Sequence, residues 1–145
     1  MDDVVVLKEG IEAWNNWRSI HRNRLPDLSD IDLTTEGFPY IHGDLDDPYD
    51  GYLEHVVFHH TNLSGVRLDD ICIRDADFES VDLEGADLTG STFIRVRLKG
   101  ANFKGADLRW VKFVESDLAG ASFGGARVEG AMIDGVPLAV FVNLE

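Results

Sequence analysis

The sequence has little cysteine and little basic charge, and it lacks a long apolar run. One cysteine, Cys72, among 145 residues excludes an internal disulfide framework and a cysteine-rich zinc site. Thirteen Lys and Arg residues stand against 27 Asp and Glu residues, a net charge of −14, which argues against a face that neutralises phosphates. No apolar run approaches the roughly 18 residues of a membrane span. We expect no direct nucleic-acid binding and no membrane insertion.

What the sequence does contain favours a folded protein of the reducing cytoplasm. Hydrophobic residues make up 44% and charged residues 28%, enough to bury a core. The apolar run from Val4 to Leu7 follows two aspartates instead of a basic region, so it is a poor signal peptide. We expect a soluble, cytoplasmic, bacterial protein.

Large apolar residues recur at every fifth position along most of the chain. The series has seventeen members without a slip: Phe58, Leu63, Leu68, Ile73, Phe78, Leu83, Leu88, Phe93, Leu98, Phe103, Leu108, Phe113, Leu118, Phe123, Val128, Ile133 and Leu138. Two residues before each such centre stands a small or β-branched residue, and nine of the 14 glycines stand two residues after a centre. Period five fits neither a helix, at 3.6 residues, nor a strand, at two.

Each pentad is therefore expected to be a short extended arm followed by a corner. The centre and the residue two before it point the same way, as alternate residues of an extended chain do. Glycine tolerates the backbone angles of a sharp corner. The arms must wind around a common axis so that their apolar sides share one interior.

The signs of the outward charges indicate how many arms make one coil. Stacked coils lie about 4.8 Å apart, close enough for facing side chains to pair. Among charged outward residues twenty positions apart, nine pairs are opposite in sign and one, Asp87 with Asp107, is alike. Six phenylalanines also form three pairs twenty residues apart: 58 with 78, 93 with 113, and 103 with 123. We predict four pentads per coil, with Asp77 beside Arg97.

These units resemble the pentapeptide-repeat family, whose units read Ala-Asp/Asn-Leu-x-x. The direct matches are Ala76-Asp77-Phe78, Ala86-Asp87-Leu88, Ala101-Asn102-Phe103 and Ala106-Asp107-Leu108. The resemblance covers residues 56–138 continuously. It implies an all-β solenoid, a right-handed quadrilateral β-helix of about four coils with a short N-terminal α-helical cap.

Four regions follow along the chain. Residues 1–25 carry apolar residues near helical spacing, with a weak point at Gly10, and Trp14 and Trp17 either cover the first coil or bind a partner. Residues 26–55 hold two in-phase copies, at Leu28 and Leu33, and then an irregular acidic loop. Residues 56–138 form the array, without a loop insertion. The apolar residues 139–145 are either a C-terminal cap or the seam of a homodimer.

The sequence contains few residues that could form a catalytic, metal-binding or cofactor-binding site. There is no glycine-rich phosphate loop, no nucleophile elbow and no Ser/His/Asp set. The acidic loop resembles a calcium loop at Asp46 and Asp50, but Pro48 and Val57 occupy two of its ligand positions. The histidines at 55, 59 and 60 lack the motif spacing of a zinc site. We predict no catalytic residue, no metal and no cofactor, and interpret the aspartates before each centre as surface ladders.

Two surface features are candidate partner-binding sites. Trp110 stands at a corner where glycine is usual, and Ile94 and Val114 stack on the following face as an exposed apolar patch. Trp110 could equally fold over Gly90 and Gly130 and shield the backbone. The acidic loop supplies the other candidates: Asp44, Asp46, Asp47 and Asp50.

Two functions remain. The first is a rigid, non-enzymatic protein–protein interaction module whose partner the sequence does not identify. The second follows from the family resemblance, since some members are acidic dimeric rods that mimic DNA, bind type II topoisomerase and protect it from quinolones. The net charge of −14 favours this reading. The basic block from Arg95 to Lys112 and the missing insertion count against it.

Overall fold

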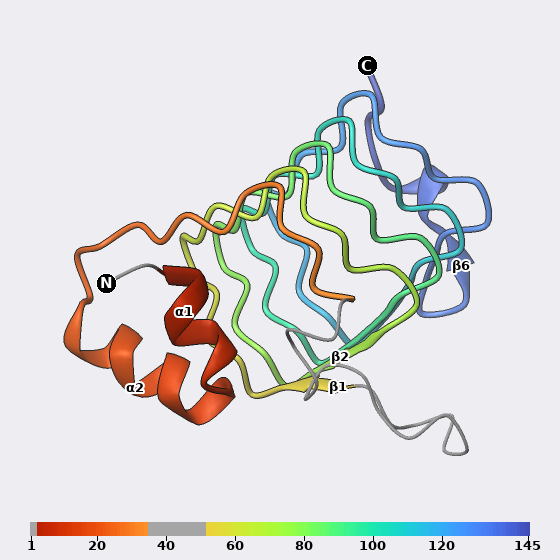
Figure 1. Ribbon diagram of the computed structural model, residues 1–145. Coiled ribbons are helices and arrows are strands. Elements are labelled where there is room, and N and C mark those ends of the chain that lie inside the picture. The colour runs from red at the N-terminus through yellow and green to blue at the C-terminus, as the bar shows by residue number, and fades with distance from the viewer. Residues whose placement is uncertain (1–2, 35–51) are drawn as a thin grey trace.

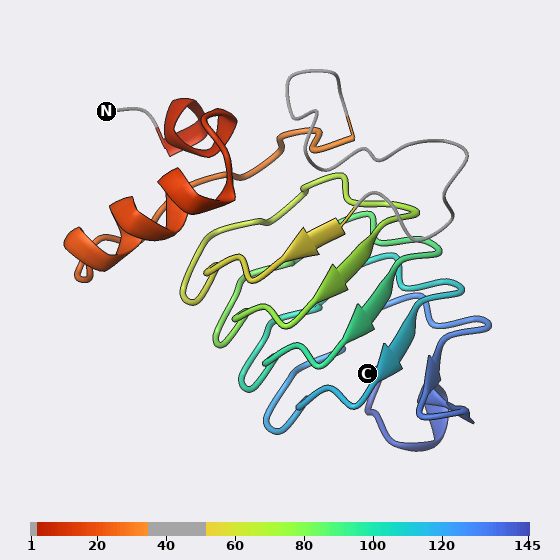
Figure 2. The ribbon, with the colours of Figure 1, turned by 90° about the horizontal axis from the view of Figure 1, so that it is seen from below.

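The computed structural model of this protein describes residues 3–34 and 52–145. Along most of the chain, each backbone segment pairs in parallel with the segment twenty residues further on. Five strands lie side by side in chain order (Figure 2): β1 (Tyr52–Glu54), β2 (Cys72–Arg74), β3 (Thr92–Ile94), β4 (Lys112–Val114) and β5 (Met132–Ile133). On the other faces isolated bridges continue the pairing, and one joins Asp77 to Arg97. The predicted twenty-residue coil is confirmed. The chain is an all-β solenoid, a right-handed quadrilateral β-helix with short N-terminal helices (Figure 1).

The interior contains the residues that the five-residue period selects. Every centre from Leu53 to Phe113 is at most 1% exposed, and most of the residues two before a centre are buried as well. Phe93 stacks on Phe113 with ring centroids 5.1 Å apart, and Phe103 stacks on Phe123 at the same distance. A buried side chain of this size stabilises the fold by about 1.5–3 kcal/mol. A single coil cannot bury its apolar side chains alone and does so only by stacking on the coils next to it. The continuous column of buried side chains along the axis therefore holds the coils together.

The aspartates before each centre help to form the corners. Oδ1 of Asp82 accepts a hydrogen bond from the backbone N–H of Glu84 at 3.0 Å, and Asn102 and Asp117 make the same bond two residues on. Such a bond closes an Asx-type turn. The interpretation of these side chains as surface ladders alone was therefore incomplete, since they also accept backbone hydrogen bonds within their own arm.

The first coil contains an insertion. Asp27 pairs with Asn62 and Asp32 with Arg67, and in both pairs the partner lies 35 residues on (62 − 27 and 67 − 32). Leu53, fully buried in β1, lies beside Ile73 of β2. The arms around residues 33 and 53 are twenty residues apart in the sequence. They nevertheless stack on two arms of the next coil that are only five residues apart. The insertion falls within residues 26–55, for which the sequence predicts irregular first repeats and an acidic loop, and the array over residues 56–138 continues without one. The series of buried centres begins one pentad earlier than Phe58, at Leu53.

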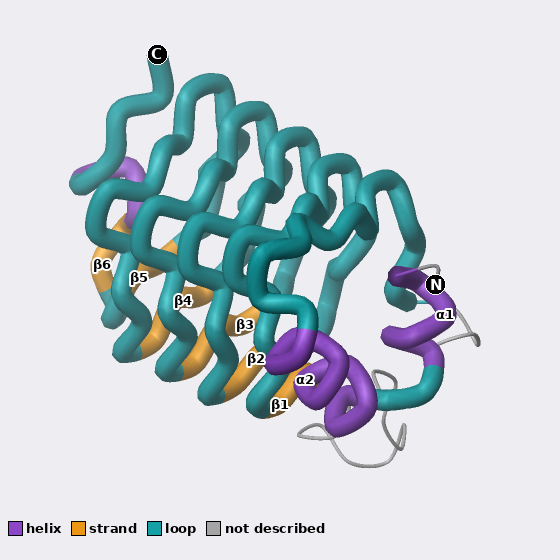
Figure 3. The backbone as a smooth tube through the Cα atoms, turned by 90° about the vertical axis from the view of Figure 1, so that its left-hand side faces the viewer, coloured by secondary structure: helices purple, strands orange, loops and turns teal. Residues whose placement is uncertain are grey.

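Two helices cover the N-terminal end of the rod, on the side opposite the C-terminus (Figure 3). They are α1 (Asp3–Lys8) and α2 (Ile11–Ile20), separated at Gly10, whose φ is +118°. Trp14 is fully buried with its ring 5.6 Å from that of Phe58, so this tryptophan packs on the first coil. None of the helices in the described part of the chain is long and apolar enough to cross a membrane.

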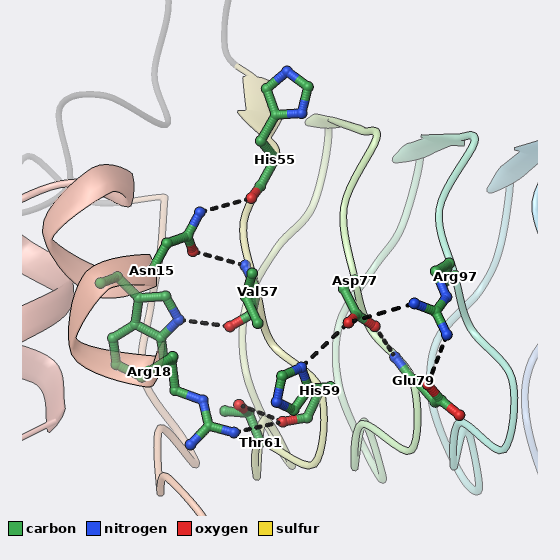
Figure 4. A network of polar contacts seen from close by, with 10 residues as sticks. Asn15, Arg18, His55, Val57, His59, Thr61, Asp77, Glu79 and Arg97 are labelled. Carbon is green, nitrogen blue, oxygen red and sulfur yellow. Dashed lines mark hydrogen bonds and ion pairs between the residues drawn. The ribbon is translucent and has the colours of Figure 1, made fainter. Parts of the chain in front are cut away.

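Side chains of α2 complete the backbone hydrogen bonds of the first coil (Figure 4). The indole Nε1 of Trp14 donates to the carbonyl of Val57 at 2.7 Å. Asn15 donates to the carbonyl of His55 at 2.8 Å and accepts from the N–H of Val57 at 2.9 Å. An unpaired strand edge is a template for association with other chains. The helix therefore replaces the missing preceding coil along this arm.

The C-terminal residues fold back over the last coil. Strand β6 (Val136–Pro137) pairs antiparallel with β5, and a 3₁₀ helix, η1 (Leu138–Val140), follows. Leu138 is fully buried, and the carbonyl of Leu144 accepts a hydrogen bond from the N–H of Gly125 at 2.8 Å. Val140 and Phe141 remain 70% and 62% exposed. The tail thus covers part of the last coil, and its second role as a dimer seam stays a prediction.

We expect Asn15→Ala to lower the free energy of unfolding by about 2 kcal/mol, because two backbone groups of the first coil lose their partner. Urea unfolding followed by circular dichroism measures this. Faster hydrogen exchange of the Val57 amide is expected as well. The exposed neighbour Asn16→Ala is the matched control, and an equal loss in both variants would show that Asn15 does not secure the cap.

Candidate docking surface

An exposed tryptophan interrupts the polar outer surface. Trp110 stands at the corner just before β4, and its side chain is 65% exposed. Its φ is +64°, in the left-handed region, which nine other described non-glycine residues of this protein also adopt, Arg95 and Glu115 among them. The corners one coil before and one coil after it are Gly90 and Gly130. We call this line of corners, formed by Asp70, Gly90, Trp110 and Gly130, the Trp110 ridge.

The indole of Trp110 lies on one of its two glycine neighbours. A Cβ built on Gly130 would lie 2.7 Å from Cδ2 of the ring and closer still to two other ring carbons. Gly90, by contrast, is covered by the carboxylate of Asp70. The expected alternative, in which Trp110 covers both glycines, is therefore wrong at Gly90. Side chains on this ridge lean toward the following coil, a direction that the twenty-residue spacing alone does not give.

Ile94 and Val114 form a separate apolar pair. They are register partners on β3 and β4, and Val114 is 36% exposed. Four residues of extended chain, roughly 13 Å, separate Val114 from Trp110. Between them stands exposed Lys112 on the same arm. The structure therefore brings Ile94 and Val114 together, but it does not join them to Trp110 in one patch.

The other sequence candidates, Asp44, Asp46, Asp47 and Asp50, lie outside the described residues. The candidate calcium loop begins there as well. The docking surface can be built only from residues of the coils.

Ion pairs between neighbouring coils cover one side of the rod. Arg95 donates two bonds to Asp75 at 2.7 and 3.2 Å, and Arg97 donates to Glu79 at 2.9 Å while lying 3.9 Å from Asp77 (Figure 4). The hydrogen bond from Arg95 holds the pKa of Asp75 below its usual range. Exposed pairs of this kind contribute at most about 1 kcal/mol each. They align the coils more than they stabilise them.

Charge is banded along the rod. The second coil, residues 66–85, carries seven acidic and two basic residues, a net charge of −5. The third coil, residues 86–105, carries one acidic and four basic residues, a net charge of +3. The inter-coil pairs of Arg95 and Arg97 cross the boundary between these bands, so part of the basic band is already occupied by neighbouring carboxylates.

The described histidines and the cysteine do not converge on a chemical site. His59 lies 3.2 Å from Asp77, whereas His55 groups with Glu54 and Asp75 within ligand reach. Asp75 in that group already accepts both bonds from Arg95. Cys72 is half-buried, and burial raises the pKa of its thiol, which disfavours the reactive thiolate.

Two open grooves flank the C-terminal tail, with volumes of about 510 and 520 Å³. The first is bordered by Leu118, Phe123 and Phe141, and the second by Val128 and Met132. Both are mostly apolar. Their position at the end of the rod follows from the coil geometry, because the last coil has no complete successor to cover it.

Comparison with known proteins agrees with this architecture. A family model for pentapeptide repeats matches residues 71–109 in eight copies. No curated protein matches the chain in sequence. Among 31 matching solved chains is a pentapeptide repeat protein from the cyanobacterium Cyanothece 51142, with a TM-score of 0.61 and 22% identity over 76% of this chain and 78% of that chain. This likeness shows a shared fold.

Two further solved structures are less similar. One is a pentapeptide repeat protein from the thylakoid lumen of Arabidopsis thaliana, with a TM-score of 0.39 and 20% identity over 76% of this chain and 59% of that chain. The other is QnrB1, described as a plasmid-mediated fluoroquinolone resistance protein, with a TM-score of 0.36 and 18% identity over 72% of this chain and 66% of that chain.

We expect Arg95→Gln to raise the pKa of Asp75 toward its ordinary value of 3.8, because the charged hydrogen bond is lost. Carboxyl chemical shifts followed by NMR over pH 2–7 measure this. A carboxylate with a depressed pKa stabilises the fold above its unfolded pKa and loses that contribution as pH falls through the folded pKa. Arg95→Gln should therefore destabilise the protein at neutral pH and not in strong acid. Lys99→Gln, on the same coil, should leave Asp75 unchanged.

Proposed function

We propose that this chain, which belongs to the pentapeptide-repeat family, is a rigid, non-enzymatic module that binds a protein partner on its outer surface. The continuous column of buried side chains supports this, because it fills the interior of the described coils, and the two open grooves lie at the C-terminal end of the rod. The two grooves at the C-terminal end have mainly apolar borders. A surface of fixed corners and arms is better suited to docking than to chemistry that needs an enclosed pocket.

The observation that carries the proposal is the seated, exposed indole of Trp110. Tryptophan is among the residues that contribute most to protein interfaces, and its exposure in a free protein is unfavourable. Holding a bulky side chain in the left-handed region costs roughly 1–2 kcal/mol more. Glycine at this corner would avoid both costs, as it does at positions 90 and 130. A partner that covers the ring would offset them.

We expect Trp110→Ala to lose a binding partner that the wild-type protein captures from its native host, while its unfolding temperature stays close to that of the wild type. Affinity capture with quantitative mass spectrometry measures the loss. Lys99→Ala, exposed on a different face, is the control and should capture the partner normally. An unchanged set of partners in Trp110→Ala would remove this residue from the docking surface.

A second candidate function is inhibition or protection of DNA gyrase by an acidic rod. The net charge of −5 on the second coil favours it. Duplex DNA carries one negative charge per ~1.7 Å of axis, whereas the ladder of Asp77, Glu79 and Arg97 alternates in sign. A supercoiling assay with purified gyrase, with and without a quinolone, tests it. We expect no effect at micromolar protein, and inhibition or drug protection would reverse the order of the two functions.

A further inference from the structure

We infer that the Trp110 ridge binds a cationic side chain, arginine or lysine, presented by a basic segment of the partner. The inference rests on the proposed function, because it names the chemistry of the partner that the same surface would receive. Three features support it: a seated aromatic face, two exposed acidic residues on the same arms, and the charge of the surrounding arms.

The aromatic face is held ready for stacking. Because Gly130 lies under the benzo ring of Trp110, a side chain there would collide with it, and the glycine acts as a seat. The opposite face of the ring is turned to solvent, in keeping with its 65% exposure. An indole face attracts a guanidinium or ammonium group placed within about 6 Å of the ring centroid. No cation stacks on Trp110 from within the described residues.

Two exposed acidic residues, Asp70 and Glu129, belong to the arms that carry this ridge. Glu129 immediately precedes the seat, and its carbonyl accepts the backbone N–H of Trp110 at 3.0 Å. Asp70 leans over Gly90, two coils before Gly130 and so roughly 10 Å away along the axis. Both residues are exposed, and neither forms an ion pair in the part of the chain that the structure describes. Both residues add negative charge to the face of the rod that carries the ring.

The nearby arginine is already engaged. Arg109 precedes Trp110 and lies one coil before Glu129 on the same face. Its guanidinium donates to Asp107 at 2.9 and 2.7 Å, which holds the group against its own arm. The ring therefore remains available to a cation from another molecule, and the carboxylate of Glu129, which also interacts with Arg109 over a longer distance, adds negative charge to the same face.

The charge of the surrounding face favours a cationic partner over an anionic one. The arms before this ridge, residues 66–70, 86–90, 106–110 and 126–130, carry five acidic residues and three arginines. The whole chain carries −14. Lys112 is the opposing charge, exposed two residues beyond Trp110 on β4. An anionic peptide would meet net repulsion, whereas for a cationic one the opposing charges are Lys112 and three arginines that lie within 4 Å of aspartates.

The test uses acetylated hexa-arginine amide as the probe and the indole N–H signals of the ¹⁵N-labelled full chain as the readout. The signal of Trp110, identified by its absence in Trp110→Phe, should shift on titration, while that of buried Trp14 stays in place. Trp110→Ala should weaken binding about two- to five-fold, the usual effect of an exposed cation–π contact. Glu129→Gln and Asp70→Asn should weaken it as well, and Lys112→Gln should strengthen it.

Two matched controls separate the ridge from general charge and backbone strain. Asp30 leans over Gly65 as Asp70 leans over Gly90, so Asp30→Asn removes the same charge away from the tryptophan. Gly120 has a φ of +72°, close to the +73° of Gly130. Gly120→Ala therefore introduces the same backbone strain as Gly130→Ala, but it leaves the ring of Trp110 in place over Gly130. We expect both controls to bind hexa-arginine like the wild type, and Gly130→Ala to bind it more weakly.

Three results would overturn the inference. They are equal affinity of wild type and Trp110→Ala for hexa-arginine, equal weakening by Asp30→Asn and Asp70→Asn, and a Trp110 shift with hexa-glutamate instead. If the partner capture still depends on Trp110, the docking function stands and only the cationic chemistry is rejected. If capture does not depend on Trp110 but hexa-arginine binds there, the ridge binds cations and the proposed partner surface is rejected.

Discussion

From residue 53 onward, each coil of this protein is fixed to the next by backbone hydrogen bonds between parallel arms whose register partners are twenty residues apart. The same period governs the inward side chains, so backbone pairing and apolar packing position the same residues. A shift of the register would disrupt both at once. The ends are the exception, since one side of each terminal coil has no neighbour. At the N-terminal end, Trp14 and Asn15 of helix α2 form hydrogen bonds with the uncovered backbone of the first coil. At the other end, the folded-back tail covers part of the last coil and bonds to its backbone.

Corner side chains introduce a direction along the rod. Asp30, Asp70 and Trp110 each lean over the glycine of the following coil. The residue at one corner therefore restricts the residue one coil later, because a Cβ at the glycine would collide with the leaning group. At Gly65, Gly90 and Gly130 glycine therefore meets two requirements, the left-handed backbone and the space taken by the leaning side chain, whereas at Gly85, Gly105 and Gly135 only the first applies. This second demand allows a large aromatic residue at the surface without a distortion of the stack.

The coil could be predicted from the sequence because its causes are local and repeat. Opposite charges at 77 and 97 and the paired phenylalanines at 93 and 113 both reported the spacing of twenty. The break in the series at Gly43 and Pro48 predicted a loop or a distorted coil between Leu33 and Leu53, and because the spacing preserves the five-residue phase, the sequence alone did not decide between the two. Where a side chain leans could not be predicted, since it depends on rotamers and not on periodicity. Trp110 was found as an exception to the glycine pattern, but its seat and its acidic neighbours required coordinates.

The insertion in the first coil shows how this architecture tolerates added length. Arms 33 and 53 keep their places against arms 68 and 73, although twenty residues connect them where five suffice elsewhere. Doubling the length of a connection costs only about 0.6 kcal/mol of closure entropy, whereas losing one buried leucine costs several times more. Corners are thus the positions at which the chain can acquire new sequence while the arms on both sides stay in register. A foreign peptide grafted at such a corner would be displayed at a defined height on a stiff scaffold.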